Sequence, residues 1–382
     1  MKITGIICEY NPLHLGHKKQ LDTVRTLQPD GGIVCLMSGN FVQRGKPAII
    51  DKAARARAAV LCGADLVLEL PPTAALSSAE CFASEGVRLL GSFCDTLCFG
   101  SETADKAQLM QTAQALLSPA FSEALCSELD KGLSFPAARQ AALLKMGLSA
   151  DLLLRPNDIL AVEYCKAIIS QNTAMIPHPI LRQGNYHDAL PDADNPSATA
   201  VRSLMLEGGA WMDYIPVEAC SCFQNAALHT ISAGERAILA RLRSMTDAEF
   251  EQLPYGSEGL WRKLMHAARQ EATLEGILTA VKSKRYTRTR LDRMIMCAFL
   301  GLTQQDLSSS APYARVLAFN DRGRKILKQA RQTGLFPNTG EKLDHDYQTI
   351  ENRIGALYGL FRTDSPAAPN AETQQRVGYI GK

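Results

Sequence analysis

Two histidines, His14 and His17, stand three residues apart in the stretch EYNPLHLGHKKQL, between an apolar run and a run with helical spacing. At this spacing both imidazoles share one side of a helix start, where unpaired backbone N–H groups and the helix dipole favour an anion. Imidazole N–H groups placed there can hold phosphate oxygens and stabilise charge that builds up on a phosphorus atom. Gly16 has no Cβ, so a nucleotide can approach the backbone closely. The alternative is that the two histidines only cap the helix.

The histidine pair (His14 and His17) needs elements that hold it, and the first half of the chain alternates between strand and helix patterns. This alternation predicts an α/β fold with a doubly wound, Rossmann-like parallel sheet, in which ligands bind beyond the carboxyl ends of the strands. Buried strands are predicted at residues 2–10, 31–39, 64–71, 95–101 and 174–183, and helices at 14–27, 50–63, 78–93, 156–171 and 197–209.

The second half of the chain has a different pattern. After Pro216 the strand signals stop and helices separated by Pro, Gly and Ser follow. We therefore expect a nucleotide-binding sheet domain over residues 1–216 and an α-helical C-terminal domain over residues 217–382. The last residues, rich in Pro, Ala and Asn, are expected to be poorly ordered.

Composition restricts the class of protein. At 382 residues, with 46% hydrophobic and 21% charged residues, the chain is typical of a globular protein of two domains. No apolar run is long enough for a membrane span, and the first apolar run is too short for a signal peptide. The eleven cysteines stand singly in apolar runs without zinc spacing. We expect reduced, buried thiols in a cytoplasmic protein with no metal site of its own and no membrane contact.

A polar loop, SGNFVQRGKPAIIDK, follows the second predicted strand. Polar loop residues after a parallel strand face the ligand crevice, so we expect Gly39, Asn40 and Arg44 to contact a ligand. The alternative is a surface turn with a helix cap at Asp51.

The segment KSKRYTRTRLDR, residues 282–293, carries six basic residues and a single acid, Asp292. A solvated helix face mixes charges of both signs, and this segment does not, so we favour an RNA contact over that alternative. Its cations would neutralise phosphates and its tyrosine would stack on a base. The predicted RNA-binding residues are Lys282, Lys284, Arg285, Tyr286, Arg288 and Arg290.

HLGH matches the HxGH signature of the nucleotidyltransferase superfamily. In chain order, GIICEYNPLHLGHKKQL, VCLMSGNFVQRGKPAIIDKAARARAAVLCGADLVLELP, LCFGSE, RPNDILAVEY, YHD…NPSATAVR and KSKRYTRTRLDR resemble the bacterial tRNA(Met) cytidine acetate ligase family over nearly the whole chain. The resemblance implies ATP-dependent activation of acetate as acetyl-adenylate. It also implies transfer of the acetyl group to the N4 amine of the wobble cytidine of elongator tRNA(Met). The implied substrates are ATP, which is accompanied by Mg²⁺, and acetate, and the implied partner is tRNA.

The family's ATP-binding residues carry over to matching positions of this chain. Leu181 stands where the first residue of a basic pair is expected, so only Arg182 is carried over there. SATAVR resembles the superfamily's second phosphate-binding motif, which meets the leaving pyrophosphate; the alternatives are a helix cap for Ser197 and a solvated charge for Arg202. The catalytic candidates are His14, His17, Lys18 and Arg202. The full predicted ATP-binding set is Ile7, Cys8, Glu9, Tyr10, Asn11, Pro12, Leu13, His14, Leu15, Gly16, His17, Lys18, Lys19, Gln20, Gly39, Asn40, Arg44, Gly100, Asn157, Arg182, Ser197 and Thr199.

Two other functions remain open on the sequence. A nucleotidyltransferase that acts on a small metabolite would use the same histidine pair, although it would leave the basic segment unexplained. An RNA-binding protein that senses a nucleotide without turnover would use both features and catalyse nothing. The sequence pattern does not indicate an oligomeric state.

Overall fold

The computed structural model describes residues 1–182, 196–283, 285–371 and 373–381. Its centre is a seven-stranded sheet in the order β7-β6-β1-β2-β5-β8-β9. The five strands from β7 to β5 are parallel, which confirms the predicted doubly wound sheet. The strands are β1 (Ile3–Cys8), β2 (Gly32–Ser38), β5 (Leu66–Leu70), β6 (Thr96–Ser101), β7 (Ile176–Leu181), β8 (Val316–Phe319) and β9 (Gly378–Tyr379).

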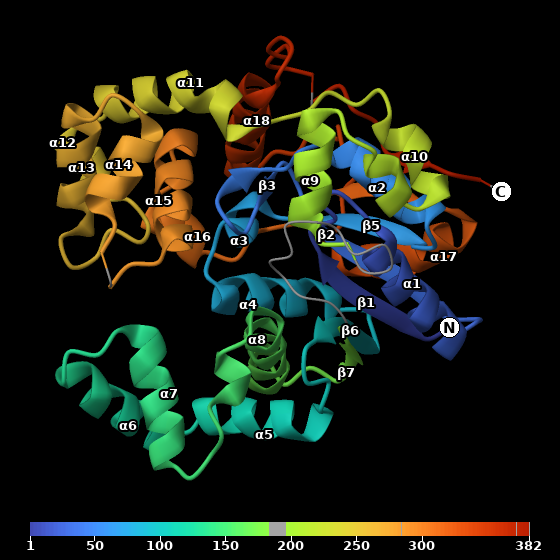
Figure 1. The fold of residues 1–382 in the computed structure, drawn as a ribbon. Helices are drawn as coiled ribbons and strands as arrows, with labels where there is room; N and C mark the ends of the chain where they lie inside the picture. The colour runs from blue at the N-terminus through green and yellow to red at the C-terminus, as the bar shows by residue number, and fades with distance from the viewer. Residues whose placement is uncertain (183–195, 284, 372, 382) are drawn as a thin grey trace.

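Helices cover both faces of this sheet (Figure 1). Successive side chains of a strand point to opposite faces, so Ile33, Cys35 and Met37 of β2 enter one core and Val34 and Leu36 enter the other. The first core is closed by α1 (Leu15–Leu27), α2 (Lys52–Leu61) and α10 (Val217–Phe223). The second is closed by α4 (Ala79–Leu90), α8 (Pro156–Ser170) and α17 (Asp321–Ala330).

The order of the strands sets where a ligand can bind. From β1 the chain moves outward through β2 and β5, and then returns to the other side of β1 to add β6 and β7. The strand order therefore reverses between β1 and β6, and the loops beyond their carboxyl ends diverge there. The loop from Glu9 to His14, which leads into α1, lies at this switch point.

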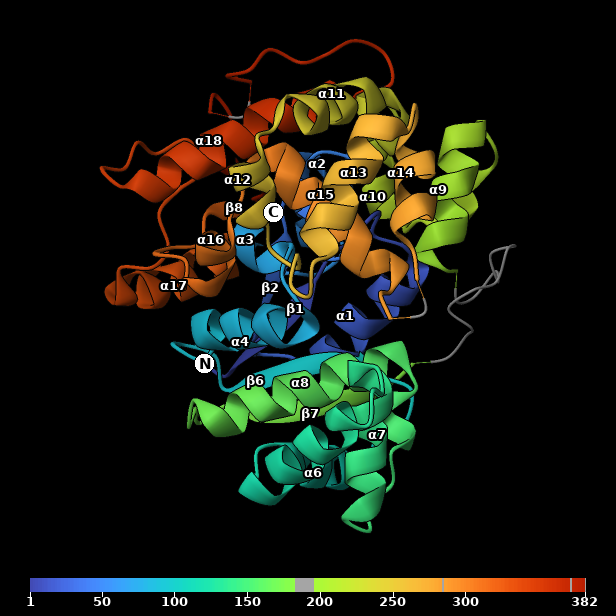
Figure 2. The ribbon, with the colours of Figure 1, turned by 90° about the vertical axis from the view of Figure 1, so that its left-hand side faces the viewer.

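Two helical bodies flank the sheet (Figure 2). One follows β6 and consists of α5 (Lys106–Leu116), α6 (Pro119–Asp130), α7 (Phe135–Lys145) and η1 (Asp151–Leu153). The other, called the helical body from here on, has its own hydrophobic core, to which Phe41 and Leu76 of the sheet region also belong. It consists of α11 (Ile231–Ser244), α12 (Asp247–Glu251), α13 (Leu260–Gln270), α14 (Leu274–Val281), α15 (Arg288–Leu300) and α16 (Gln304–Ser308), with α18 (Asp346–Tyr358) and η4 (Gly359–Phe361) packed on it.

Shorter elements complete the chain. A hairpin after β2 joins β3 and β4, and a four-residue helix, α3, follows β5. α9 precedes the short turn η2, and η3 follows α17. Their bounds are β3 (Phe41–Val42), β4 (Lys46–Pro47), α3 (Pro72–Ala75), α9 (Ala198–Glu207), η2 (Trp211–Tyr214) and η3 (Arg331–Thr333).

The chain after Pro216 is mainly helical, as predicted, but the expectation that no strand follows Pro216 is wrong. β8 pairs antiparallel with β5, and β9 pairs parallel with β8. β8 has four residues and β9 has two, so neither is long enough to carry a strand pattern. Residues 378–379, in the final stretch that was expected to be poorly ordered, thus extend the sheet. The division of the chain at residues 216 and 217 stays a prediction.

The cysteines differ partly from expectation. All eleven are free thiols, and most are buried or half-buried, but Cys81 and Cys126 are exposed. In the part of the chain that the structure describes, no helix is long and apolar enough to cross a membrane.

Candidate active site

The histidine pair opens α1. The backbone N–H of Gly16 donates to Nδ1 of His14 at 3.2 Å, and the backbone N–H of His14 donates to Nδ1 of His17 at 3.3 Å. The capping role that the sequence left open is therefore present, and each ring uses only Nδ1 for it. A neutral imidazole that accepts at Nδ1 carries its hydrogen on Nε2. Both rings thus keep an Nε2–H donor for another group.

The rings lie together, with centroids 3.8 Å apart. His14 is buried, and among the described residues its Nε2 atom has no hydrogen-bond partner. A buried N–H without a partner costs free energy unless a ligand satisfies it. Gly16 belongs to this arrangement, since a Cβ there would lie only 3.0 Å from Cε1 of His14. The missing Cβ of Gly16 therefore leaves space for the His14 ring.

The electrostatics keep both imidazoles neutral. Burial, followed by the neighbouring cations Arg182 and Arg202, lowers the pKa of His14 to about 3. Burial, followed by the neighbouring His14 and Arg182, also lowers the pKa of His17 well below its ordinary value. Neutral N–H donors surrounded by two guanidinium groups suit a polyanion, because the positive charge comes from the arginines and the hydrogen bonds come from the imidazoles.

The carboxyl ends of β6 and β7 bring a second group of predicted residues to the site. Arg182 follows β7, and its Nη1 donates to Oδ1 of Asn157 at 2.9 Å. Asn157 opens α8, and its Nδ2 donates to Oε1 of Glu102 at 2.6 Å. Gly100 pairs with Ile180 across the two strands, and a Cβ on Gly100 would lie 4.0 Å from the side chain of Arg182. Gly100, Asn157 and Arg182 therefore form one cluster, as predicted.

Arg202 reaches the histidine loop from α9. Its Nη1 donates to the carbonyl oxygen of Asn11 at 2.7 Å, and its Nη2 donates to Oγ1 of Thr199 at 3.0 Å. This excludes the alternative of a solvated helix charge. Ser197 is the N-cap of α9, with Oγ accepting from the N–H of Ala200 at 3.1 Å, so the capping alternative is present there. The preceding stretch of the motif, including YHD, lies outside the described residues.

The remaining residues of the stretch 7–20 divide by orientation. Ile7, Tyr10 and Leu13 place their side chains in the hydrophobic core, so only their main chain can face a nucleotide. Lys18 forms an ion pair with Asp22 on the outer side of α1. The others lie along the loop and the first turns of α1, and only Lys19 among them is exposed; they are Cys8, Glu9, Asn11, Pro12, Leu15, Lys19 and Gln20.

The residues of the loop after β2 lie in two places, one close to Glu9 and the other in a separate pocket. Arg44 is exposed in the β3–β4 turn, close enough to Glu9 to lower its pKa, although burial of that carboxyl raises it overall. Asn40 is buried and lines a separate pocket of about 360 Å³ together with Glu69. No residue of the stretch 7–20 lines that pocket. A Cβ on Gly39 would overlap Oε1 of Glu69, so this loop packs on the end of β5.

Four charged residues that hold the ends of strands and helices around the site were not singled out by the sequence reasoning. Arg55 is fully buried, and its guanidinium donates to the carbonyl oxygens of Glu9 at 2.7 Å and Ser38 at 3.0 Å, which ties the ends of β1 and β2 together. Glu102 caps α8 by accepting from the N–H of Asp158 at 2.7 Å. Lys52 and Glu69 form a buried ion pair at 2.7 Å. The one available signal was that charged residues in apolar runs, such as ARARAA, must find buried partners.

Two arginines of the basic segment pair with acids outside it, and Arg288 also pairs with Asp292 inside it at 3.1 Å. Arg285 pairs with Glu258 at 2.8 Å, and Arg288 pairs with Glu275 at 2.7 Å. The expectation that Tyr286 stacks on a base is wrong, because its side chain is buried in the core of the helical body. The other members are placed as follows: Lys282 Nζ donates to the carbonyl oxygen of Tyr286 at 2.7 Å, Arg290 Nη2 to that of Tyr255 at 2.8 Å, and Lys284 lies outside the described residues.

A parallel sheet with an HxGH loop at its switch point, two neutral imidazoles at a helix start and two arginines beside them defines a nucleotidyl transferase. A model of the family described as HIGH Nucleotidyl Transferase matches residues 1–371. The tRNA(Met) cytidine acetate ligase of Clostridium novyi is 37% identical over 356 residues, which cover 88% of this chain and 89% of that protein. The ligase of the same name from Acetivibrio thermocellus is 35% identical over 362 residues, which cover 88% and 87%.

Solved structures agree with these relatives. The apo structure of Thermotoga maritima TmcAL has a TM-score of 0.91 and 28% identity and covers all of both chains. The same protein bound with alpha-thio ATP has a TM-score of 0.88 at the same identity and coverage. The chain belongs to the tRNA(Met) cytidine acetate ligase family, and it is an ATP-dependent enzyme of the ligase class.

Proposed function

We propose that this chain activates acetate with ATP and transfers the acetyl group to the N4 amine of the wobble cytidine of elongator tRNA(Met). The observation that carries the proposal is the paired Nε2–H donors of His14 and His17 beside two arginines at the sheet's switch point. The relatives named tRNA(Met) cytidine acetate ligase supply the acid and the acceptor.

The reaction has two balanced steps. In the first, a carboxylate oxygen of acetate attacks the α-phosphorus of ATP, the bond to the β-phosphate oxygen breaks, and pyrophosphate leaves. In the second, N4 of cytidine attacks the acetyl carbonyl carbon, the bond from that carbon to the phosphate oxygen breaks, AMP leaves, and N4 releases one proton to water. Both steps build negative charge on oxygens, so positioning and electrostatic stabilisation dominate catalysis.

The residues of the site divide this work. The Nε2–H groups of His14 and His17 donate to phosphate oxygens and stabilise charge as the α-phosphorus reacts. Arg202, anchored to the histidine loop through Asn11, takes the leaving pyrophosphate. Arg182, which donates to Asn157, fixes the nucleotide. Lys18 contributes positive potential at the start of α1 without leaving its pair with Asp22.

Mg²⁺ accompanies the triphosphate in this proposal. The described residues contain no group of three or more His, Cys, Asp or Glu side chains that could hold a metal ion. Mg²⁺ would be held by oxygens of the triphosphate and by water, and it would offset the negative charge of the phosphates. We place the enzyme in the cytoplasm, where its tRNA and ATP are found.

The outer face of the helical body contacts the tRNA in this proposal. The side chains of Arg285 and Arg288 are 63% and 45% exposed, and their partners Glu258 and Glu275 are exposed too. Exposed ion pairs contribute only about 0–1 kcal/mol, so RNA phosphates can replace these carboxylates. Replacing Arg285 and Arg288 with Ala should weaken tRNA binding and lower the salt slope by roughly one unit of log K per lost contact. An unchanged affinity and slope would remove this face from the proposal.

The test of the whole proposal is mass spectrometry of tRNA nucleosides after incubation with ATP, acetate and bulk tRNA. We expect acetylated cytidine that depends on acetate and on ATP. Acetate-dependent pyrophosphate release without any acetylated nucleoside would point instead to a small-molecule acceptor. ATP binding without pyrophosphate release, both with and without tRNA, would refute the proposed catalytic activity.

A further inference from the structure

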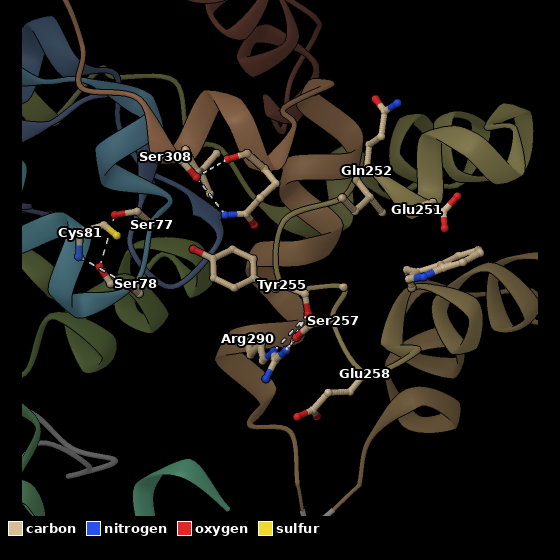
Figure 3. Close-up of a pocket in the computed structure, with 15 residues that line it drawn as sticks. Ser77, Ser78, Cys81, Glu251, Gln252, Tyr255, Ser257, Glu258, Arg290 and Ser308 are labelled. Atoms are coloured by element: carbon tan, nitrogen blue, oxygen red, sulfur yellow. Dashed lines mark hydrogen bonds between the residues drawn. The ribbon is translucent and has the colours of Figure 1, made fainter. Parts of the chain in front are cut away.

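A pocket of about 690 Å³ lies between the start of α4 and the helical body (Figure 3). Its walls come from four separate parts of the chain: residues 77–81, residues 251–261, Arg290 and residues 304–308. No residue of the stretch 7–20 lines it. Its volume is within the range of small-molecule sites, which often lie where two packed bodies meet.

The wall made by residues 255–258 is preformed. The hydroxyl of Tyr255 donates to the carbonyl oxygen of Leu76 at 2.8 Å, and Arg290 donates to the carbonyl oxygen of Tyr255 at 2.8 Å and to Oγ of Ser257 at 2.9 Å. Tyr255 and Glu258 have φ angles of 67° and 60°, which residues other than glycine rarely adopt. Such conformations persist only where the surroundings fix them, so a ligand would meet a formed site.

The lining selects a flat, neutral group. Trp261 and Tyr255 supply aromatic surface, and the exposed carboxylates Glu251 and Glu258 outnumber the one lining guanidinium, Arg290. This balance disfavours a phosphate inside the pocket. It favours a ring that carries N–H donors, because carboxylates accept from the exocyclic amines of nucleobases. Figure 3 shows Ser77, Ser78 and Cys81 of the sheet region on the side of Tyr255 opposite to Glu251 and Gln252.

Cations stand next to this lining. Arg262 and Lys263 follow Trp261 on α13 and are exposed, and the Arg262 guanidinium lies 4.9 Å from the Trp261 ring centroid. Arg285 is paired with Glu258 of the lining. Acids inside and cations beside them match one unpaired nucleotide, with its base in the pocket and its phosphates outside.

We propose that this pocket receives one unpaired nucleobase of the RNA substrate, stacked on Trp261 and hydrogen-bonded by the polar side chains of the lining. This inference rests on the proposed function, since it needs an RNA substrate. It gives Arg290 of the basic segment a role in forming the pocket wall, in place of a phosphate contact.

The first test compares Trp261→Ala with Trp211→Ala, a change at the other tryptophan of the chain, which lies in η2. The probe is bulk tRNA, and the readout is its dissociation constant. Loss of one stacked base costs about 1–3 kcal/mol, so Trp261→Ala should raise the dissociation constant roughly 5- to 150-fold. Trp261→Phe should recover part of this loss, and Trp211→Ala should leave the constant unchanged. Equal affinity of the Trp261→Ala protein and the wild type would overturn the inference.

The second test needs no variant and so does not depend on folding of a mutant. Cys81 lines the pocket and is exposed, and Cys126 on α6 is exposed but does not line it. Bulk tRNA should slow alkylation of Cys81 by iodoacetamide and leave Cys126 unaffected, whereas equal alkylation of Cys81 with and without tRNA would contradict the inference. Failure of acetylation with intact Trp261-dependent binding would refute the proposed function alone. Normal acetylation with binding indifferent to Trp261 would refute the pocket alone.

Discussion

Replacing His14 with two different amides separates the two hydrogen bonds of its ring. In His14→Asn the amide oxygen takes the place of Nδ1 and still accepts from the N–H of Gly16, but nothing replaces the Nε2–H donor. In His14→Gln the longer side chain carries an N–H near the position of Nε2, but loses the cap. Each variant should lower the free energy of unfolding by about 1 kcal/mol, because one loses buried ring atoms and the other loses an N-cap.

Their rates should differ far more than their stabilities. Removing one preorganised donor to a developing oxyanion costs about 100- to 1,000-fold in rate, equivalent to about 2.7–4 kcal/mol. We therefore expect acetate-dependent ATP–pyrophosphate exchange to fall by that factor in His14→Asn and by about tenfold in His14→Gln. The buried Nε2 without a partner is the atom on which this difference depends.

A matched control is available at His229. It is also buried, with a lowered pKa, and stacks on Tyr358 at a centroid distance of 4.0 Å, but it is not among the residues of the proposed site. His229→Asn should lower stability without lowering the exchange rate of the folded protein. Exchange at the wild-type rate in His14→Asn would refute the role of Nε2–H. Equal loss in all three variants would show that the exchange assay reports stability only.

Three further predictions concern the surroundings of the histidine pair. Arg202→Lys, which cannot span both partners of the guanidinium, should raise the KM for ATP about tenfold in pyrophosphate exchange; an unchanged KM would exclude a phosphate contact. Glu102→Gln should lower the melting temperature of the protein and raise the KM for ATP, because an amide has only one oxygen to accept from Asn157 and from the backbone N–H of Asp158. An unchanged KM would show that this network does not position ATP. Because burial holds the pKa of His14 to about 3 and lowers that of His17, against 6.5 when unfolded, the unfolded chain binds more protons below pH 6.5. The free energy of unfolding, from urea titrations, should therefore drop on acidification by up to about 1.4 kcal/mol per pH unit and per histidine; His14→Gln should reduce this slope, and an equal slope would contradict the lowered pKa.

The catalytic end of the sheet was predictable because its signals are local. A strand followed by a short loop and a helix places His14 and His17 together whatever the rest of the chain does, since residues three apart on a helix are neighbours. Likewise, the carboxyl ends of parallel strands meet at one edge, which brings Gly100 and Arg182 to the same place. The resemblance to the ligase family rested on these same segments.

The sequence by itself therefore determined the parallel sheet, the position of the histidine pair and the class of chemistry. Only the tertiary structure decided what lies beside them, because side chains pair across distances that no local pattern records. Arg202 reaches a carbonyl 191 residues away, and Arg285 and Arg288 of the basic segment pair with Glu258 and Glu275 on other elements. Tyr286 is buried for the same reason: packing among helices fixed its orientation, while its sequence neighbours are charged. β8 joins the sheet because β5 offers it an unpaired edge and hydrophobic cover on both faces, a property of the assembled fold and not of four residues.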